Sequence, residues 1–283
     1  MSEPNLTLPV PNDRTIVDGI WVDTLDDLSV ILDKDPGFIA IGRSKLAKSV
    51  TKFAASAQIA TGQTEDIWDA GGNLQYLDSA ETINISSSST EDNPAGTGAF
   101  SIQVLGLDDE FEEIDEIVVL NGTTNVPTIN QYKRIYRMFV VTADQAAAEM
   151  SGAVGTIAAT AAIAGTLQAQ INDGTNQTLM SHYTIPKGFI GGITTGALSV
   201  GKNDDATFLL RTRAPFPGAV FTLSFTAKLF QSVEQIDAKI PLGPIPEGTD
   251  IKFQALAGTN NTVVHVSYIL VLARTETLDG GVT

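Results

Sequence analysis

The run Ile190–Arg213 reads IGGITTGALSV, GKNDD, ATFLLRTR, and it decides the fold class. Its outer parts, Ile190–Val200 and Ala206–Arg213, are rich in the apolar and β-branched residues that favour strands. The five residues between them, Gly201–Asp205, are of the types that form tight turns. Two such runs separated by a short turn cluster predict two strands, and this is the clearest all-β pattern in the chain.

The same pattern continues on both sides, through the segment 172–283. Further runs are typical of strands: Met180–Ile185, Val220–Leu229, Asp250–Ala255 and Thr262–Leu272. Turn clusters separate the runs: Pro186–Gly188, Pro215–Gly218, Pro244–Gly248 and Gly258–Asn261. Short strands at this spacing predict a β-sandwich or jelly-roll-like domain over 172–283.

The segment 63–171 carries a similar pattern and predicts a second β-sandwich-like domain. Asn121-Gly122 after the apolar run Ile117–Leu120 is a hairpin signal. The Ala-, Gly- and Thr-rich stretch Ala146–Ala169 allows two interpretations, a close subunit contact or an edge strand with a loop. Strands are expected at Phe100–Val104, Phe111–Val119 and Tyr132–Thr142.

The segment 1–62 is predicted to be an N-terminal docking arm that contains short helices. Thr24 is a candidate helix cap, and Asp35-Pro36-Gly37 a candidate end. In Arg43–Ile59, the apolar residues Leu46, Val50, Phe53 and Ala57 recur at helical spacing, which predicts a second helix. An extended arm is the alternative for this stretch. The predicted fold class is therefore all-β, mainly antiparallel and sandwich- or jelly-roll-like, with this arm.

Opposite charges are grouped along the chain. Arg43–Lys52 contains four basic residues and no acidic one, whereas no Lys or Arg occurs between Lys52 and Lys133. One interpretation is two solvated surfaces. The other is that the basic stretch docks on an acidic neighbour in an assembly, since complementary charge selects partners.

Composition excludes several functions. A formal net charge of -16 disfavours nucleic acids and acidic membrane surfaces as partners. The absence of cysteine excludes thiol catalysis, thiolate metal sites and disulfides. The N-terminus lacks the pattern of a signal peptide, and no stretch is typical of a spanning helix, so synthesis in a host cytoplasm is expected.

The sequence assigns no catalytic, cofactor-binding or metal-ligating residue, and the chain is predicted not to be an enzyme. His182 and His265, the only histidines, lie in strand-like runs without a second ligand at metal spacing. The acidic run Asp108–Glu116 and the cluster Asn203–Asp205 are interpreted as solvated turns rather than calcium sites. Trp21 and Trp68 are interpreted as packing anchors rather than a sugar platform.

A set of short motifs resembles a family of virion structural proteins of tailed phages, especially marine ones. The resemblance covers roughly 50–272, and the motifs keep the same order. They include Val50–Phe53, Glu65–Gly72, Ser87–Asp92, Gly96–Ala99, Gln103–Asp108, Val119–Thr124, Arg134–Met138, Asn176–Met180, Tyr183–Gly188 and Pro246–Ile251.

The resemblance implies a non-enzymatic component of the virion, with no catalytic residues and no cofactor. The leading hypothesis is a capsid decoration, or cement, protein that contacts the major capsid protein or other virion proteins. Cyclic symmetry makes a homotrimer the expected oligomer. The alternative is a tail, fibre or baseplate component that attaches to the host surface, with Trp68, Tyr76 or Phe216 exposed. A glycan hydrolase with two suitably spaced carboxylates is the enzymatic alternative.

Overall fold

The computed structural model describes residues 46–144, 152–231 and 233–275, with 15–17, 20–22, 39, 40, 42 and 44. From 46 to 275, every regular element of the described residues is a strand, and every strand pair is antiparallel. The all-β, antiparallel fold class is thus confirmed; a jelly-roll topology stays a prediction. The helix expected to begin at Thr24 lies outside the described residues.

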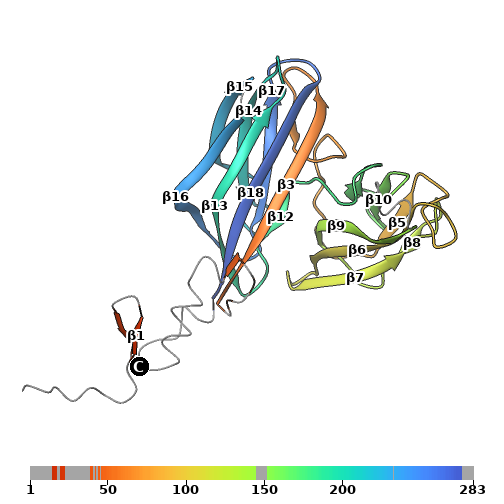
Figure 1. Cartoon of the computed structure of the whole chain (residues 1–283), viewed down its shortest axis with the longest axis horizontal. Helices are drawn as coiled ribbons and strands as arrows, with labels where there is room; N and C mark the ends of the chain where they lie inside the picture. The colour runs from red at the N-terminus through yellow and green to blue at the C-terminus, as the bar shows by residue number, and fades with distance from the viewer. Residues whose placement is uncertain are drawn as a thin grey trace, which may run out of the picture.

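A sandwich of two sheets forms the larger lobe (Figure 1). The first sheet has the order β16 (Val233–Ile245), β13 (Phe189–Val200), β18 (Thr262–Arg274) and β3 (Ala47–Ile59). The second has the order β12 (Tyr183–Thr184), β17 (Asp250–Ala257), β14 (Asp205–Arg213) and β15 (Thr222–Phe230), and β4 (Thr64–Asp66) also pairs with β17. The turn clusters at 201–204 and 258–261 each carry the chain from one sheet to the other: β13 and β14 do not pair with each other, and neither do β17 and β18.

The core of the sandwich forms because buried and less buried side chains alternate along its central strands. Along β18, every second side chain from Thr262 to Leu272 is buried, so one face of this central strand points inward. β14 alternates in the same way and places Phe208 and Leu210 against the same core from the other sheet. Apolar burial on two facing sheets therefore holds this lobe together.

Two smaller sheets form the second lobe (Figure 1). Its core includes Ile83, Ile102, Tyr132, Met138 and Ile157, all fully buried. One sheet has the order β11 (Leu167–Ile171), β10 (Ile157–Ala161), β5 (Ile83–Ser87) and β8 (Val126–Pro127); the other has β7 (Glu113–Val119), β6 (Ala99–Leu107) and β9 (Arg134–Ala143).

The small lobe is an insertion into the sandwich. Ile67 belongs to the sandwich core and Trp68 to the core of the small lobe. The chain returns at Met180, which packs in the small lobe, and Tyr183, which packs in the sandwich. The sandwich is therefore built from two chain segments far apart in sequence. Whether 1–62, 63–171 and 172–283 behave as separate domains stays a prediction.

The helix predicted for Arg43–Ile59 is wrong, because Ala47–Ile59 is strand β3, paired with β18. The inward face of β3 carries Lys52, Ala54 and Ser56, all buried. Two of these three residues are polar, which hid the period of two in the sequence. This part of the expected arm is instead the edge strand of the first sheet.

A short hairpin precedes the two lobes. β1 (Thr15–Val17) pairs with β2 (Ile20–Val22), with Ile16 in register with Trp21. Among the described residues, these two strands form a sheet of their own. A two-stranded hairpin this short is at best marginally stable in water by itself.

Candidate functional site

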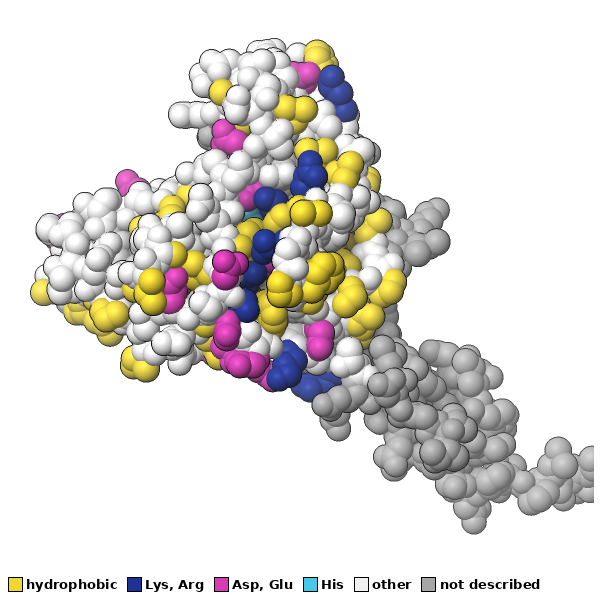
Figure 2. All heavy atoms as spheres, turned by 180° about the vertical axis from the view of Figure 1, so that it is seen from behind, with side chains coloured by type: hydrophobic (Ala, Val, Ile, Leu, Met, Phe, Trp, Pro, Cys, Tyr) yellow, Lys and Arg dark blue, Asp and Glu magenta, His cyan; other side chains and the backbone are white. Residues whose placement is uncertain are grey.

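Charged side chains, all but one of them buried, gather where the two lobes meet. We call this cluster the polar seam; it comprises Asp66, Arg134, His182, Arg213, Asp250 and Lys252. Arg134 comes from β9 of the small lobe, whereas Asp250 and Lys252 come from β17 of the sandwich. Figure 2 shows Lys and Arg side chains in a column down the middle of one face, flanked by hydrophobic side chains.

Asp250 accepts hydrogen bonds from two arginines and a threonine. Arg134 donates from Nε to Oδ1 at 2.8 Å and from Nη2 to Oδ2 at 3.1 Å. Arg213 donates from Nε to Oδ2 at 3.0 Å, and the Thr184 hydroxyl donates to Oδ1 at 2.6 Å. Burial acts to raise the pKa of Asp250, but the charge and hydrogen bond of Arg134, with Thr184 and Arg213, hold that pKa below its usual value.

Asp66 is the second centre of the polar seam. Its carboxylate accepts from His182 Nε2 at 2.9 Å, from Lys252 Nζ at 2.7 Å and from Gln254 Nε2 at 2.8 Å. The backbone N–H of Leu74 donates to it as well, at 2.9 Å. Burial opposes the charge, but His182 and Lys252 lower the pKa of Asp66 to about 2. The carboxylate is therefore ionised at neutral pH.

His182 contacts this carboxylate as a neutral ring. Burial lowers the pKa of His182, and the effect outweighs the hydrogen bond to Asp66. Since the Asp66 carboxylate accepts only, the proton of the neutral ring lies on Nε2. The buried Nδ1 atom has no hydrogen-bonding partner in the described residues, so a second proton there would be unsatisfied.

Lys52 and Asp69 are two further ionisable groups at the junction, and each charge acts on the pKa of the other. Lys52 is buried and donates from Nζ to the backbone carbonyl of Tyr136 in the small lobe. Burial and the nearby Arg137 charge lower the pKa of Lys52 to about 7. Burial also raises the pKa of Asp69 to about 7, although Leu179 donates a backbone hydrogen bond to its carboxylate at 3.2 Å.

The contacts of the polar seam connect the two lobes and are structural. Within the described residues, each buried charged side chain has a hydrogen-bonding partner, and no group of three or more His, Asp or Glu residues could hold a metal ion. The aromatic rings of Tyr76 and Phe221 lie against the cations: the Arg213 guanidinium is 4.4 Å from the Tyr76 ring. Such contacts stabilise cations out of water.

The other histidine lies elsewhere. His265 is exposed on β18 and is in register with Ser199 of β13. The two histidines come from different parts of the sandwich, and the described residues give neither a metal-ligating partner.

The acidic run Asp108–Glu116 forms the turn between β6 and β7 and the start of β7. Asp108 accepts from the backbone N–H groups of Glu110 and Glu112, at 3.0 and 2.9 Å, as a turn residue does. Glu113 is ion-paired with Lys48, and Glu112 with Lys187 at 2.9 Å. The basic stretch and the acidic run thus meet within one chain at Lys48.

The remaining predicted residues have structural contacts. Asp204 accepts from the backbone N–H of Val263 at 3.1 Å and fixes the turn between β13 and β14. Trp68 is buried and donates from Nε1 to the carbonyl of Gly71 at 2.8 Å, as expected of a packing anchor. Tyr76 packs between arginines, whereas Phe216 is 64% exposed.

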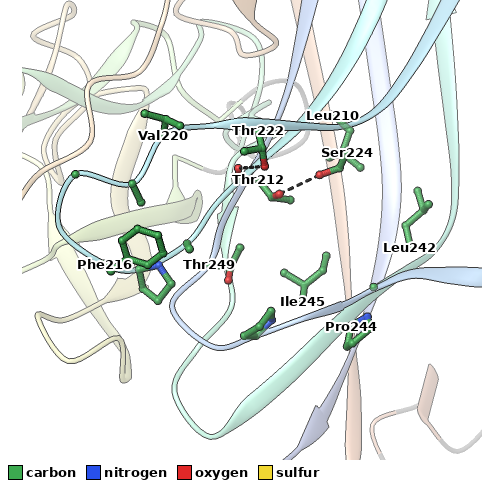
Figure 3. A pocket seen from close by; sticks show the side chains of 16 residues that line it. Leu210, Thr212, Phe216, Val220, Thr222, Ser224, Leu242, Pro244, Ile245 and Thr249 are labelled. Carbon is green, nitrogen blue, oxygen red and sulfur yellow. Dashed lines mark hydrogen bonds between the residues drawn. The ribbon is translucent and has the colours of Figure 1, made fainter.

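A mainly apolar groove, here called the edge groove, opens between the edge strands β15 and β16 of the two sheets (Figure 3). Its volume is about 630 Å³. Leu210, Leu242 and Ile245 line its interior, and the hydroxyls of Thr212 and Ser224 share a hydrogen bond of 2.9 Å within it. None of its lining side chains is charged.

Exposed apolar side chains continue from the edge groove along the same edge. Phe216 and Val220 lie on its rim, Leu223 on the outer side of β15 and Phe230 at the far end of that strand. All four are more than half exposed. Lys228 interrupts the apolar side chains between Leu223 and Phe230 on β15. Exposed apolar side chains beside an apolar groove are typical of protein–protein interaction sites.

Sequence reasoning missed both features. Arg134 and Asp250 are 116 residues apart in the chain, and their meeting depends on how the lobes pack. The one available signal is in β17, where Asp250, Lys252 and Gln254 alternate with apolar residues yet are themselves buried. The edge groove depends on β16, which the sequence did not predict as a strand.

Comparisons with known proteins assign no family to this chain. No family model matches the chain, and a search of curated proteins finds no match. Solved structures of viral capsid proteins are among the likenesses found. One is the MCP of STIV, Sulfolobus Turreted Icosahedral Virus, which is 10% identical to this chain. The match covers 83% of this chain and 100% of the other, with a TM-score of 0.23. A subviral particle of infectious bursal disease virus VP2 is 11% identical, covering 81% and 73%, with a TM-score of 0.19. At these scores the likeness carries no argument.

Among the described residues, no helix has the length and apolar character needed to cross a membrane.

Proposed function

We propose that this protein is a non-enzymatic structural component of a virion, and specifically a decoration protein on the head of a tailed phage. One observation carries the building-block part of the proposal. In the described residues, the buried charges of the polar seam link the two lobes, while large apolar side chains are exposed along the edge of the sandwich. That division suits a rigid body that binds other proteins.

The virion assignment and the phage type rest on the collinear sequence motifs between residues 50 and 272. The expected partners are the major capsid protein or other virion proteins, and the expected oligomer is a homotrimer. With a net charge of -16, two copies repel at long range, so their contacts favour uncharged surface. The edge groove supplies such a surface.

Copy number per particle tests the proposal. Purified particles are analysed by quantitative mass spectrometry with labelled peptides of this protein and of the major capsid protein. A decoration protein is expected at a simple ratio to the shell protein. A much lower ratio would contradict decoration and favour the tail, fibre or baseplate alternative. Absence from purified particles would contradict the virion role itself.

A further inference from the structure

The edge groove lies at the end of the sandwich where the N-terminal segment joins it. Ala47, the first residue of β3, is in register with Ala273 of β18, and Ile245 at the groove is in register with Gly191 of β13. Phe189 of β13 is in turn opposite Arg274. The start of β3 and the groove are therefore at the same end of one sheet, about 14 Å apart across three strand spacings.

The hairpin β1–β2 has the chemistry to fill this groove. Its two strands read TIV and IWV and contain no charged residue, as the groove lining contains none. The hairpin is too short to be stable alone and needs an apolar surface to pack on. A Trp in a pocket is a frequent anchor of protein contacts.

The size of the exposed edge indicates that more than the hairpin covers it. β15 has nine residues and spans about 27 Å, whereas each hairpin strand has three residues and spans about 7 Å. Leu223 and Phe230 lie on β15 outside the groove lining, and both are more than half exposed. One hairpin therefore leaves these two side chains in water, whereas a second subunit that contributes its hairpin also has a body to cover them.

The connection between the hairpin and the sandwich is long enough for the hairpin of one copy to reach a second copy. Roughly 24 residues separate Val22 from Ala47, and a chain of that length spans about 80 Å at most. We propose that the β1–β2 hairpin of one copy docks in the edge groove of a second copy, so that exchanged hairpins hold copies of this chain together. This inference rests on the assembly role proposed above.

Disulfide trapping tests the exchange cleanly, because the chain has no cysteine. One full-length variant carries Val22→Cys in the hairpin, and the other carries Thr222→Cys at the mouth of the groove. The two are mixed, equilibrated and oxidised, and a size tag on one identifies the mixed dimer on a non-reducing gel. The matched control replaces Thr222→Cys by Lys228→Cys, which is on the same strand, also exposed, at the other end.

Exchange predicts that Val22→Cys cross-links to Thr222→Cys about ten times faster than it cross-links to Lys228→Cys, because docking raises the local concentration of the two thiols. Equal rates for the two pairs of variants, or no cross-link, would overturn the proposal. So would a chain carrying both Val22→Cys and Thr222→Cys that closes an intramolecular disulfide instead of linking copies.

Light scattering gives a second readout that does not require particles. Trp21→Ala leaves the two lobes intact and is expected to shift the mass from oligomer toward monomer on dilution. An unchanged mass profile would overturn the exchange. Cross-linking and light scattering use the purified protein and do not depend on its copy number in the virion. A failure of the hairpin exchange is therefore distinguishable from a failure of the decoration role.

Discussion

Arg134 and Asp250 are 116 residues apart in sequence and joined by two parallel hydrogen bonds, which tie the small lobe to the sandwich. Both side chains are almost fully withdrawn from solvent. The fork of the guanidinium matches the two carboxylate oxygens, the geometry that makes this kind of pair strong and specific. Because Arg213 binds the same carboxylate, Asp250 holds two cations at once.

Asp250→Ala is expected to destabilise the protein by about 3–5 kcal/mol, because it leaves buried cations without their carboxylate. Urea unfolding followed by circular dichroism measures the change. Lys228→Ala is the matched control: its ion pair with Asp205 is exposed and 3.7 Å long, and its loss is expected to cost less than about 1 kcal/mol. Equal effects of the two substitutions would contradict the structural role of Asp250.

Lys52 and Asp69 are expected to make stability depend on pH in opposite directions. The folded-state pKa of Lys52 is about 7 and its usual value is 10.5, so between these values the unfolded chain binds more protons. The free energy of unfolding therefore gains a contribution as pH rises from about 7 to 10.5. Lys52→Met is expected to remove this contribution, of at most about 1.4 kcal/mol per pH unit.

The sign is reversed for Asp69, whose pKa rises from 3.8 to about 7 on folding. Its stabilising contribution is complete below pH 3.8 and is lost as pH rises through about 7. Asp69→Asn is expected to remove that loss. The measurement is the free energy of unfolding from about pH 4 to about pH 10 for the three proteins, compared as difference curves. Parallel curves for wild type and Lys52→Met above neutral pH would contradict the lowered pKa of Lys52.

Asp92 is expected to be essential for the small lobe. Its fully buried carboxylate accepts from the Ser87 hydroxyl at 2.5 Å and from the backbone N–H groups of Ala99, Val154 and Gly155 at 2.9, 3.1 and 3.0 Å. Asp92→Ala leaves several buried donors unsatisfied, at about 1–3 kcal/mol each.

Hydrogen exchange measured by mass spectrometry checks this prediction, with faster exchange expected for the amides of Ala99 and Gly155. Glu91→Ala is the control, since Glu91 is adjacent, exposed and bonded only to Thr97 by its side chain, at 3.2 and 3.3 Å in the described residues. Unchanged protection of Gly155 in Asp92→Ala would contradict the role given to this carboxylate.

Gly106 on β6 is expected to tolerate no side chain. An added Cβ would collide with the carbonyl oxygen of Arg134 and lie 2.6 Å from Cδ1 of Tyr132, and both neighbours are buried. Gly106→Ala must displace the backbone of β9 and is expected to cost at least about 1–3 kcal/mol. Thermal unfolding measures the change, and a melting temperature equal to that of the wild type would be inconsistent with this packing.

The sequence predicts several strands of the sandwich but misses β3 and β16. Ala206–Arg213 and Thr262–Leu272 are recognisable because apolar residues fill their inward face. β3 resembles a helix in sequence because Lys52 and Ser56 occupy buried positions. β16 escapes prediction altogether. Its sequence, VEQIDAKIPLGPI, mixes charges with two prolines, and prolines are typical of edge strands.

The polar seam is beyond prediction for a different reason. No local pattern says that Arg134 will meet Asp250, because their contact follows from how the two lobes pack. By contrast, the interpretation of Trp68 as a packing anchor needs only its residue type and is in line with its burial. Residues that stabilise their own neighbourhood can be inferred from sequence; residues that join distant segments cannot.

The place of β18 has a consequence for synthesis. This strand, Thr262–Arg274, lies between β13 and β3 and hydrogen-bonds to both, so the first sheet has no continuous pairing until it is present. A ribosome delivers β3 early and β18 near the end of the described chain, with most of the two lobes between them. A nascent chain therefore leaves β3 without its partner until translation is nearly complete, and a chain stopped before Thr262 cannot close the sandwich. Only copies that include β18 then form a closed sandwich with its edge groove, so chains truncated before Thr262 are excluded from any assembly that uses the groove.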